Sequence, residues 1–361
     1  MEDIEKILFE FDINRYEINI NNQNDHFVYI QKLVHAFNDE LCEGFNRKKI
    51  EKFNFLFADD FELNGCAFST SGNDFICLNK GSVVNLFKTF SKLMQHPDVL
   101  SRIDNSGEKY IDKIIEPVFN DERKLFMYDG PKSSIRRDVV AAMSMISIIY
   151  IIFHEFGHLY NGHIRWLRDS CGVKKLKITE NEFDNNNFLY YYKALEMDAD
   201  AFAACRTADI IASYIDDPKR SPELYFFDSF KDNYDLFTIL HISVYIFYLT
   251  MSPVECIGSM IDKTHYLPTK IRCAQVFDII KEYLSNNRKV EIDNRLVDDE
   301  LKIIHSQFVR LFRINISRQE YSELRSDKVK RSIERTNQCW VEIRDELQKH
   351  AFYQLYSSPN K

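Results

Sequence analysis

Apolar and polar positions change their spacing several times along this chain, and each spacing predicts a different element. In the first 50 residues the apolar side chains recur every three or four positions, which is typical of an amphipathic helix. The residues that show this spacing are Phe27, Ile30, Leu33, Val34, Phe37 and Leu41. Between residues 53 and 80 the apolar residues alternate with polar ones, so we expect strands with a hairpin near 70–74. Helical spacing returns over Ser82–Leu93.

The second half of the chain predicts longer helices separated by polar connections. The stretch over 97–137 is polar and is interrupted by proline and glycine, which favours turns and loops. The elements expected after it are a helix from about Arg136 to about Arg168, a polar connection over 169–188, a helix over about Tyr190–Ile215 and a buried helix over 235–251. Beyond residue 285 the pattern is helical, and the interleaved charges of 320–349 are typical of a solvated helix face.

Two apolar runs are long enough to raise the question of a membrane. Val139–Phe153 has 15 residues and Leu236–Met251 has 16, whereas a helix needs about 20 residues to span the hydrocarbon core of a bilayer. Runs of this length are more typical of buried core helices. We therefore expect two core helices, with membrane association as the alternative.

Composition narrows the fold class. With 361 residues, of which 45% are apolar, the chain can bury a sizeable core, and its 10 glycines and 8 prolines are few for an all-β protein. We expect a mainly α (α+β) protein with a small β-sheet. The changes in spacing divide it into an N-terminal helical segment (1–52), a central domain (53–284) and a charged C-terminal helical extension (285–361).

Charge and cysteine usage bear on partners and location. The 47 basic and 55 acidic residues give a net charge of −8, which offers no electrostatic attraction for nucleic acid. Eight cysteines are scattered without any C-x-x-C pair, as is typical of reduced thiols in a cytoplasmic protein. The acidic start of the chain lacks the basic and apolar regions of a signal peptide. We therefore expect a cytoplasmic protein without a nucleic-acid partner.

Residues 154–158 carry the chemistry that the sequence indicates most clearly. They read His-Glu-Phe-Gly-His, an H-E-x-x-H motif at the end of an apolar helical run. Residues four apart share a helix face, so His154 and His158 can bind one Zn²⁺ while Glu155 stands beside an open coordination position. In that position Glu155 can serve as a general base for an attacking water.

A catalytic zinc site needs a third protein ligand. His163 is five residues after His158 and would point away from the metal on a continuous helix. Glu196 and Asp200 share one helix face, and Asp198 points the opposite way. We therefore predict Glu196 as the third ligand and Asp200 as the acceptor for the second N–H of a ligand histidine.

The sequence also offers several donors that could stabilise an oxyanion near the metal. These candidates are His265, Arg272, His241 and the cluster Tyr190–Tyr192. Among them His265 is the leading catalytic candidate, although each is more commonly a structural residue.

Two segments together resemble a known family. HEFGHLYNGH followed by ALEMDADAFA resembles the gluzincin arrangement, HExxH and then ExxxD on a second helix, and is most similar to the Lit-type phage-exclusion peptidases. The likeness covers about 60–275 and extends more distantly to the membrane CAAX-protease and HtpX-like group. It implies a zincin-like metallopeptidase domain in which zinc is bound by His154, His158 and Glu196, with Glu155 as the base and Asp200 behind the ligands.

The resemblance also implies a function. Lit-type enzymes are cytosolic endopeptidases that cut a host translation factor when a phage product is present. The expectation is therefore a zinc-dependent, conditionally activated endopeptidase with a protein substrate and an activating trigger peptide. The alternatives are a membrane-associated HtpX/CAAX-type metalloprotease and a non-catalytic, zinc-stabilised regulatory protein.

The strand over 73–79 provides a further expectation. Its β character allows it to form a sheet edge to which a substrate peptide could add as a strand. An interior strand is the alternative. The polar connection over 169–188 is placed to act as a lid or as a partner-binding loop.

Overall fold

The computed structural model of the chain describes residues 4–18, 26–44, 53–70, 72–104, 130–172, 186–217, 222–228, 230, 233–251, 261, 264, 266–290, 294–314 and 324–355. Its α-helices are α1 (Ile4–Glu10), α2 (His26–Gly44), α3 (Lys80–Met94), α4 (Ser134–Tyr160), α5 (His163–Cys171), α6 (Asn186–Asp216), α7 (Asn233–Met251), α8 (Thr269–Tyr283), α9 (Asn294–Leu311) and α11 (Asp327–Leu347). Its strands are β1 (Phe53–Ala58), β2 (Gly65–Thr70) and β3 (Asn73–Asn79). A 3₁₀ segment η3 (Pro222–Phe227) and a π-helical turn η4 (Leu284–Arg288) complete the elements. The fold is mainly helical with a small sheet, as the spacing predicted.

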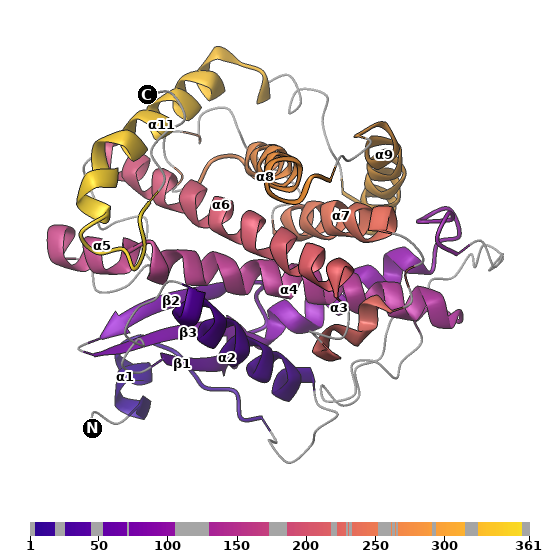
Figure 1. Ribbon diagram of the computed structural model, residues 1–361, viewed down its shortest axis with the longest axis horizontal. Helices are drawn as coiled ribbons and strands as arrows, with labels where there is room; N and C mark the ends of the chain where they lie inside the picture. The colour runs from indigo at the N-terminus through magenta and orange to yellow at the C-terminus, as the bar shows by residue number, and fades with distance from the viewer. Residues whose placement is uncertain are drawn as a thin grey trace.

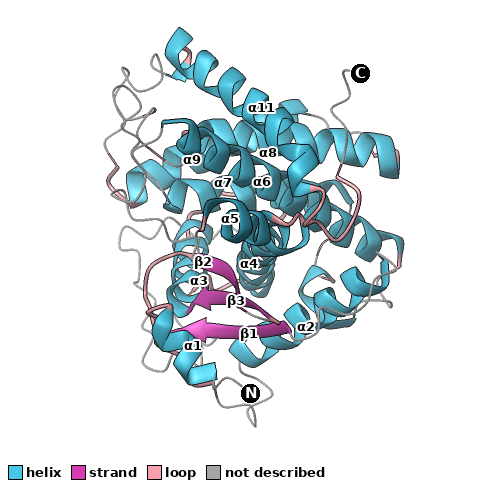
Figure 2. Cartoon of the chain, turned by 90° about the vertical axis from the view of Figure 1, so that its left-hand side faces the viewer, coloured by secondary structure: helices cyan, strands magenta, loops and turns pink. Residues whose placement is uncertain are grey.

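The three strands form one mixed sheet in the order β1-β3-β2. Strands β2 and β3 form the predicted antiparallel hairpin, in which Thr70 pairs with Asn73, while β1 lies parallel to β3. The interpretation of 73–79 as a sheet edge is therefore wrong. Five consecutive buried residues over 74–78 explain the difference, because a strand between two neighbours carries a continuous buried run. In Figure 2, β2 is the strand nearest to α4 and β1 is the farthest from it.

Helix α4 runs through the centre of the protein. Its first turn is capped by Ser133, whose hydroxyl accepts a hydrogen bond from the backbone N–H of Arg136. The sheet packs against one side of α4, and α6, α7 and α8 lie on the other side (Figure 1). Because neighbours surround it, α4 is apolar almost all round rather than along one stripe.

The expected continuous helix from Arg136 to Arg168 is interrupted. Helix α4 ends at Tyr160, and a new helix, α5, begins at His163. The break occurs at Gly162, whose φ of 81° lies in the left-handed region that glycine adopts without a Cβ penalty. Periodicity did not reveal this break, because apolar residues continue at helical spacing on both sides of it.

Helices α4 and α6 pack closely against each other. A Cβ atom at Gly157 would lie 3.0 Å from the Cα atom of Ala199. Small residues on both helices therefore let the two backbones approach. This approach brings together the polar side chains that lie just before and just after Gly157 and Ala199 in the sequence.

Among the residues that the structure describes, two helices are long and apolar enough to cross a membrane. They are α4 and the part of α7 over Tyr234–Met251, whose mean hydropathies are 1.9 and 1.3. Most of each apolar window lies inside the protein, 89% and 78% respectively, as in the core helices of globular proteins.

The C-terminal helix α11 packs on α5 and α6 (Figure 1). One face of it is buried, and its many charged side chains lie on the remaining surface. The segment after it returns to the end of α4, where the backbone N–H of Phe352 donates to the carbonyl of Tyr160 at 2.8 Å. The end of the described chain is thus attached to the end of the central helix.

The close approach at Gly157 generates a stability prediction. Gly157→Leu should lower the free energy of unfolding by about 1–3 kcal/mol, because the added side chain has to push α4 away from α6. Urea unfolding followed by circular dichroism would measure the change. Gly44→Leu is the matched control, since a Cβ atom at Gly44 meets nothing within 4 Å. Equal unfolding midpoints for both variants would contradict the prediction.

Candidate metal centre

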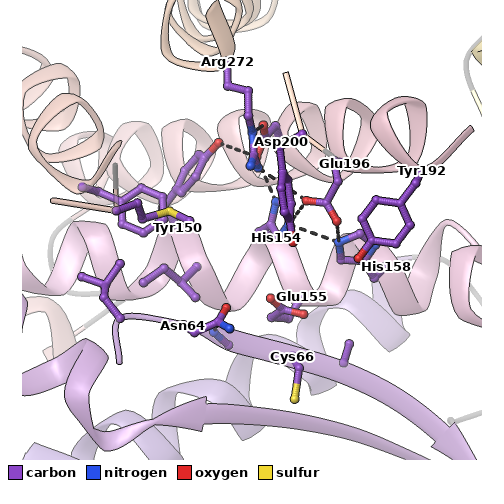
Figure 3. Close-up of a pocket in the computed structure, with 17 residues that line it drawn as sticks. Asn64, Cys66, Tyr150, His154, Glu155, His158, Tyr192, Glu196, Asp200 and Arg272 are labelled. Carbon is purple, nitrogen blue, oxygen red and sulfur yellow. Dashed lines mark hydrogen bonds and ion pairs between the residues drawn. The ribbon is translucent and has the colours of Figure 1, made fainter. Parts of the chain in front are cut away.

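A cavity of about 160 Å³ opens between the edge strand β2 and the helices α4, α6 and α8. Figure 3 shows Glu155 on the β2 side of the cavity, with Glu196, Asp200 and Arg272 entering from the opposite side. The lining also includes apolar residues from α4 and α7. Side chains from five elements, β2, α4, α6, α7 and α8, therefore meet at one place.

Three potential ligand atoms converge in this cavity. Nε2 of His154 and Nε2 of His158 lie 3.1 Å apart, as the one-turn spacing on α4 requires. The carboxylate of Glu196 approaches these atoms with Oε2 at 3.2 Å from His154 and Oε1 at 3.4 Å from His158. The three residues form a group that could hold a metal ion.

The spacing of these atoms fits zinc. Bonds of about 2.0–2.1 Å at tetrahedral angles place two ligand atoms about 3.3 Å apart. The two histidine nitrogens lie 3.1 Å apart, and each lies 3.2–3.4 Å from one of the two carboxylate oxygens of Glu196, which is close to that value. Two imidazoles and a carboxylate are also the donor set of many catalytic zinc sites, which keep a fourth position open.

A buried ion-pair network supports His154 from behind. Its Nδ1 lies 2.9 Å from Oδ1 of Asp200, the position predicted for an outer partner of a ligand histidine. Arg272 of α8 binds the same carboxylate with two donors, Nε at 2.7 Å and Nη2 at 2.8 Å. The hydroxyl of Tyr150 donates to Oδ1 of Asp200 at 3.3 Å. The contacts from Arg272 and Tyr150 fix the carboxylate of Asp200 beside the ring of His154.

The charges in this network shift the ionisation of its members. Burial alone would lower the pKa of His154, but hydrogen bonds to Asp200 and Glu196 raise it to about 10. Burial alone would raise the pKa of Asp200, but Arg272 and His154 lower it to about 2. Without a metal ion, the ring of His154 is therefore protonated on both nitrogens at neutral pH, and its positive charge lies between the carboxylates of Asp200 and Glu196.

Glu155 lies beside the ligand group without belonging to it. Its side chain is buried, and burial raises its pKa. A backbone hydrogen bond links it to Ala67 of β2, and a Cβ atom at Gly65 would lie 3.3 Å from its Oε1. The carboxylate therefore faces both the cavity and the edge strand.

His163 occupies a place that a continuous helix would not give it. Because the chain turns at Gly162, the ring of His163 folds back so that its Nδ1 lies 3.1 Å from Nδ1 of His158. Its other nitrogen, Nε2, lies 3.1 Å from Oδ2 of Asp198. Asp198 thus faces away from the ligand group, as its helix position predicted, yet it contacts the residue behind His158.

The expected donors for an oxyanion have different outcomes. His265 lies outside the described residues. His241 is buried against Phe277 with its Nδ1 2.8 Å from the carbonyl of Phe237, and Arg272 is engaged with Asp200. Tyr192 lines the cavity one turn before Glu196 on α6.

Sequence reasoning missed two further tyrosines of the cavity lining, Tyr150 and Tyr266. Tyr150 could have been found, because it stands one helical turn before His154 on the same face of α4. Tyr266 directly follows His265, so the sequence analysis pointed to this segment but selected the neighbouring residue.

The chain matches no protein-family model, and neither the curated proteins nor the solved structures contain a significant match to it. The assignment of the site therefore depends on the motif and on the geometry of the ligand group.

The raised pKa of His154 generates a prediction about zinc binding. Zinc needs a neutral imidazole, so binding at pH 8 should release about one proton from His154, where an unperturbed histidine would release almost none. For the same reason zinc affinity should rise about tenfold per pH unit as the pH rises from 7 towards 9. Calorimetry in buffers of different ionisation enthalpy would count the protons.

Asp200→Asn provides the control for this prediction. It removes a negative charge beside His154 and should reduce the number of protons released at pH 8. Zinc binding by the wild-type protein without proton release at pH 8 would contradict the protonation assigned to His154.

Proposed function

We propose that the protein is a zinc-dependent endopeptidase. The observation that carries this proposal is the position of Glu155, a buried carboxylate beside three ligands that leave the cavity side open. A structural zinc site is closed by four protein ligands and has no use for such a carboxylate. A peptidase site needs both the open position and the base.

The residues present fit a hydrolytic mechanism. Zinc bound by His154, His158 and Glu196 would polarise a carbonyl group and lower the pKa of a bound water molecule to about 7. Glu155 takes a proton from the water that attacks the scissile carbonyl carbon, and later gives that proton to the leaving amine. Because burial raises the pKa of Glu155, its carboxyl group is suited to holding a proton between these two steps.

We propose that the substrate lies along β2 instead of β3. The carbonyl of Asn64 accepts from the N–H of Asn79, so the alternate residues Gly65 and Ala67 turn their backbone groups away from β3. Gly65, Cys66 and Ala67 line the cavity. The N–H of Gly65 donates to Oδ1 of Asn64, and Ala67 is linked to Glu155, so an extended peptide would replace these contacts when it pairs with this edge beside Glu155. Such pairing favours a protein substrate.

For the oxyanion we propose a tyrosine hydroxyl as donor, with His265 as the remaining alternative. Burial raises the pKa of Tyr192, and the nearby charge of Glu196 raises the pKa of Tyr266. Both hydroxyls therefore stay protonated and can donate a hydrogen bond at neutral pH. Both residues line the cavity that holds the ligand group.

We also propose a setting for this activity, a conditionally activated cytoplasmic protease of phage defence. The support is the resemblance of HEFGHLYNGH and ALEMDADAFA to the Lit-type peptidases, which act on a translation factor in the presence of a phage product. A second candidate is a membrane-associated protease, favoured by the length and hydropathy of α4 and α7. Fractionation of expressing cells would separate the two settings.

The role of Glu155 predicts that zinc binding and hydrolysis can be separated. Glu155→Gln should still bind about one zinc per chain but lose at least about 100-fold in peptide hydrolysis, because the amide cannot accept the proton. His154→Ala should lose the metal itself. Elemental analysis and a peptide-cleavage assay would measure both effects. A fully active Gln variant would overturn the assignment.

The proposed setting predicts selective cleavage. Wild-type protein should leave casein largely intact and should cut one native host protein strongly when phage infection supplies the trigger. Mass spectrometry of new protein termini in infected cells, with Glu155→Gln as the matched control, would identify the substrate. Efficient digestion of unfolded proteins without a trigger would count against regulation.

A further inference from the structure

The two ligand histidines are supported in different ways. His154 directs its Nδ1 to the carboxylate of Asp200, while His158 directs its Nδ1 to another imidazole, that of His163. His163 is fully buried and contacts Asp198 with its remaining nitrogen. Behind His158 a second histidine therefore stands between the ligand histidine and the carboxylate, whereas His154 contacts its carboxylate directly.

The order of donors and acceptors in this arrangement is fixed by Asp198. An ionised carboxylate only accepts hydrogen bonds, so Nε2 of His163 has to carry the proton that it shares with Asp198. With that proton on Nε2, His163 can offer the lone pair of its Nδ1 to Nδ1–H of His158, which lies 3.1 Å away. When the proton of His158 is on Nδ1, its Nε2 has a free lone pair on the side of His154 and can bind a metal ion.

The carboxylate of Asp198 is held by residues outside the motif. Asn161, in the turn after α4, donates to Oδ2 of Asp198 through its Nδ2. The hydroxyl of Tyr353 donates to Oδ1 of Asn161 at 2.5 Å. This hydrogen bond holds the side-chain amide in the orientation that directs Nδ2 to Asp198. The same turn lies against the backbone of His350, where a Cβ atom at Gly162 would come within 2.6 Å. The segment after α11 therefore fixes the turn that places His163.

We propose that His163 and Asp198 are positioning residues for the zinc ligand His158, and that Tyr353 makes the C-terminal segment part of the metal centre. The inference rests on the zinc site of the proposed function, but it concerns metal affinity and not hydrolysis. Neither His163 nor Asp198 contacts the metal position. They act by selecting the tautomer and the ring orientation of His158.

Two substitutions of similar size at His163 separate hydrogen bonding from packing. In His163→Gln the amide can still accept from His158 and donate to Asp198, whereas in His163→Leu it can do neither. Zinc affinity, measured by competition with a chelator, should fall about 10–100-fold in the Leu variant and stay within about threefold of wild type in the Gln variant. Asp198→Ala should resemble His163→Leu.

His241→Leu is the matched control for these variants. His241 is also a buried histidine, but its partner is the carbonyl of Phe237 and it does not line the cavity. Its substitution should leave zinc affinity unchanged. Tyr353→Phe, which removes one hydroxyl from Asn161, should weaken zinc binding by about threefold to tenfold, a smaller loss because Asn161 and Asp198 remain.

A spectroscopic measurement on the wild-type protein tests the same inference without requiring that any variant folds. With ¹⁵N-labelled histidine in the zinc-loaded protein, long-range ¹H–¹⁵N correlation spectra assign the tautomer of each ring. His163 should be protonated at Nε2 only, and His158 at Nδ1. A proton at Nδ1 of His163 would overturn the inference, as would wild-type zinc affinity in a folded His163→Leu variant.

The outcomes distinguish this inference from the proposed function. Zinc binding with the expected tautomers but without peptidase activity would overturn the function alone. Peptidase activity with unchanged affinity in His163→Leu would overturn the inference alone. A wild-type protein that binds no zinc would overturn both.

Discussion

Helices α4 and α6 approach each other so closely at Gly157 that a Cβ atom there would lie 3.0 Å from the Cα of Ala199. This approach determines the rest of the site. The histidines of α4 and the carboxylates of α6 each repeat at four residues, so two helices in contact present two layers, His154 with Asp200 and His158 with Glu196. A larger residue at the contact would separate the layers, and separations of 3.1–3.4 Å would no longer be available for one ion.

Charge balance explains why such a polar group can be buried. Removing carboxylates from water costs several kcal/mol each unless opposite charges compensate them. Glu196 and Asp200 together carry two negative charges, and Arg272 supplies one positive charge through two hydrogen bonds to Asp200. The second positive charge is a proton on His154, whose pKa is raised to about 10, or a bound metal ion in its place. A positive charge at this place, either the imidazolium of His154 or a bound cation, therefore balances the second carboxylate.

Much of the fold and the ligand group could be predicted from the sequence, because both depend on local periodicity. The hairpin, the helices α3, α6 and α7 and the closeness of His154, His158 and Glu196 follow from spacing within single elements plus one helix contact. The order of the strands could not be obtained in this way. The position of β1 beside β3 is a long-range pairing, and only the continuous buried run of β3 indicated an interior strand.

The support behind His158 shows where local reasoning ends. The motif places a histidine at 158, but the environment of its second nitrogen depends on the turn at Gly162, on α6 and on Tyr353, which lies 192 residues after its partner Asn161. Of these three features, only the turn has a signal in the sequence, because a glycine such as Gly162 commonly ends a helix. Because the turn is held by backbone and side-chain contacts from the C-terminal segment, the position of His163 behind His158 depends on chain that folds onto the site from a distance. If His158 binds zinc as proposed, metal affinity and the docking of the C-terminal segment are coupled, so zinc binding would stabilise the docked segment by the same free energy by which docking favours zinc binding.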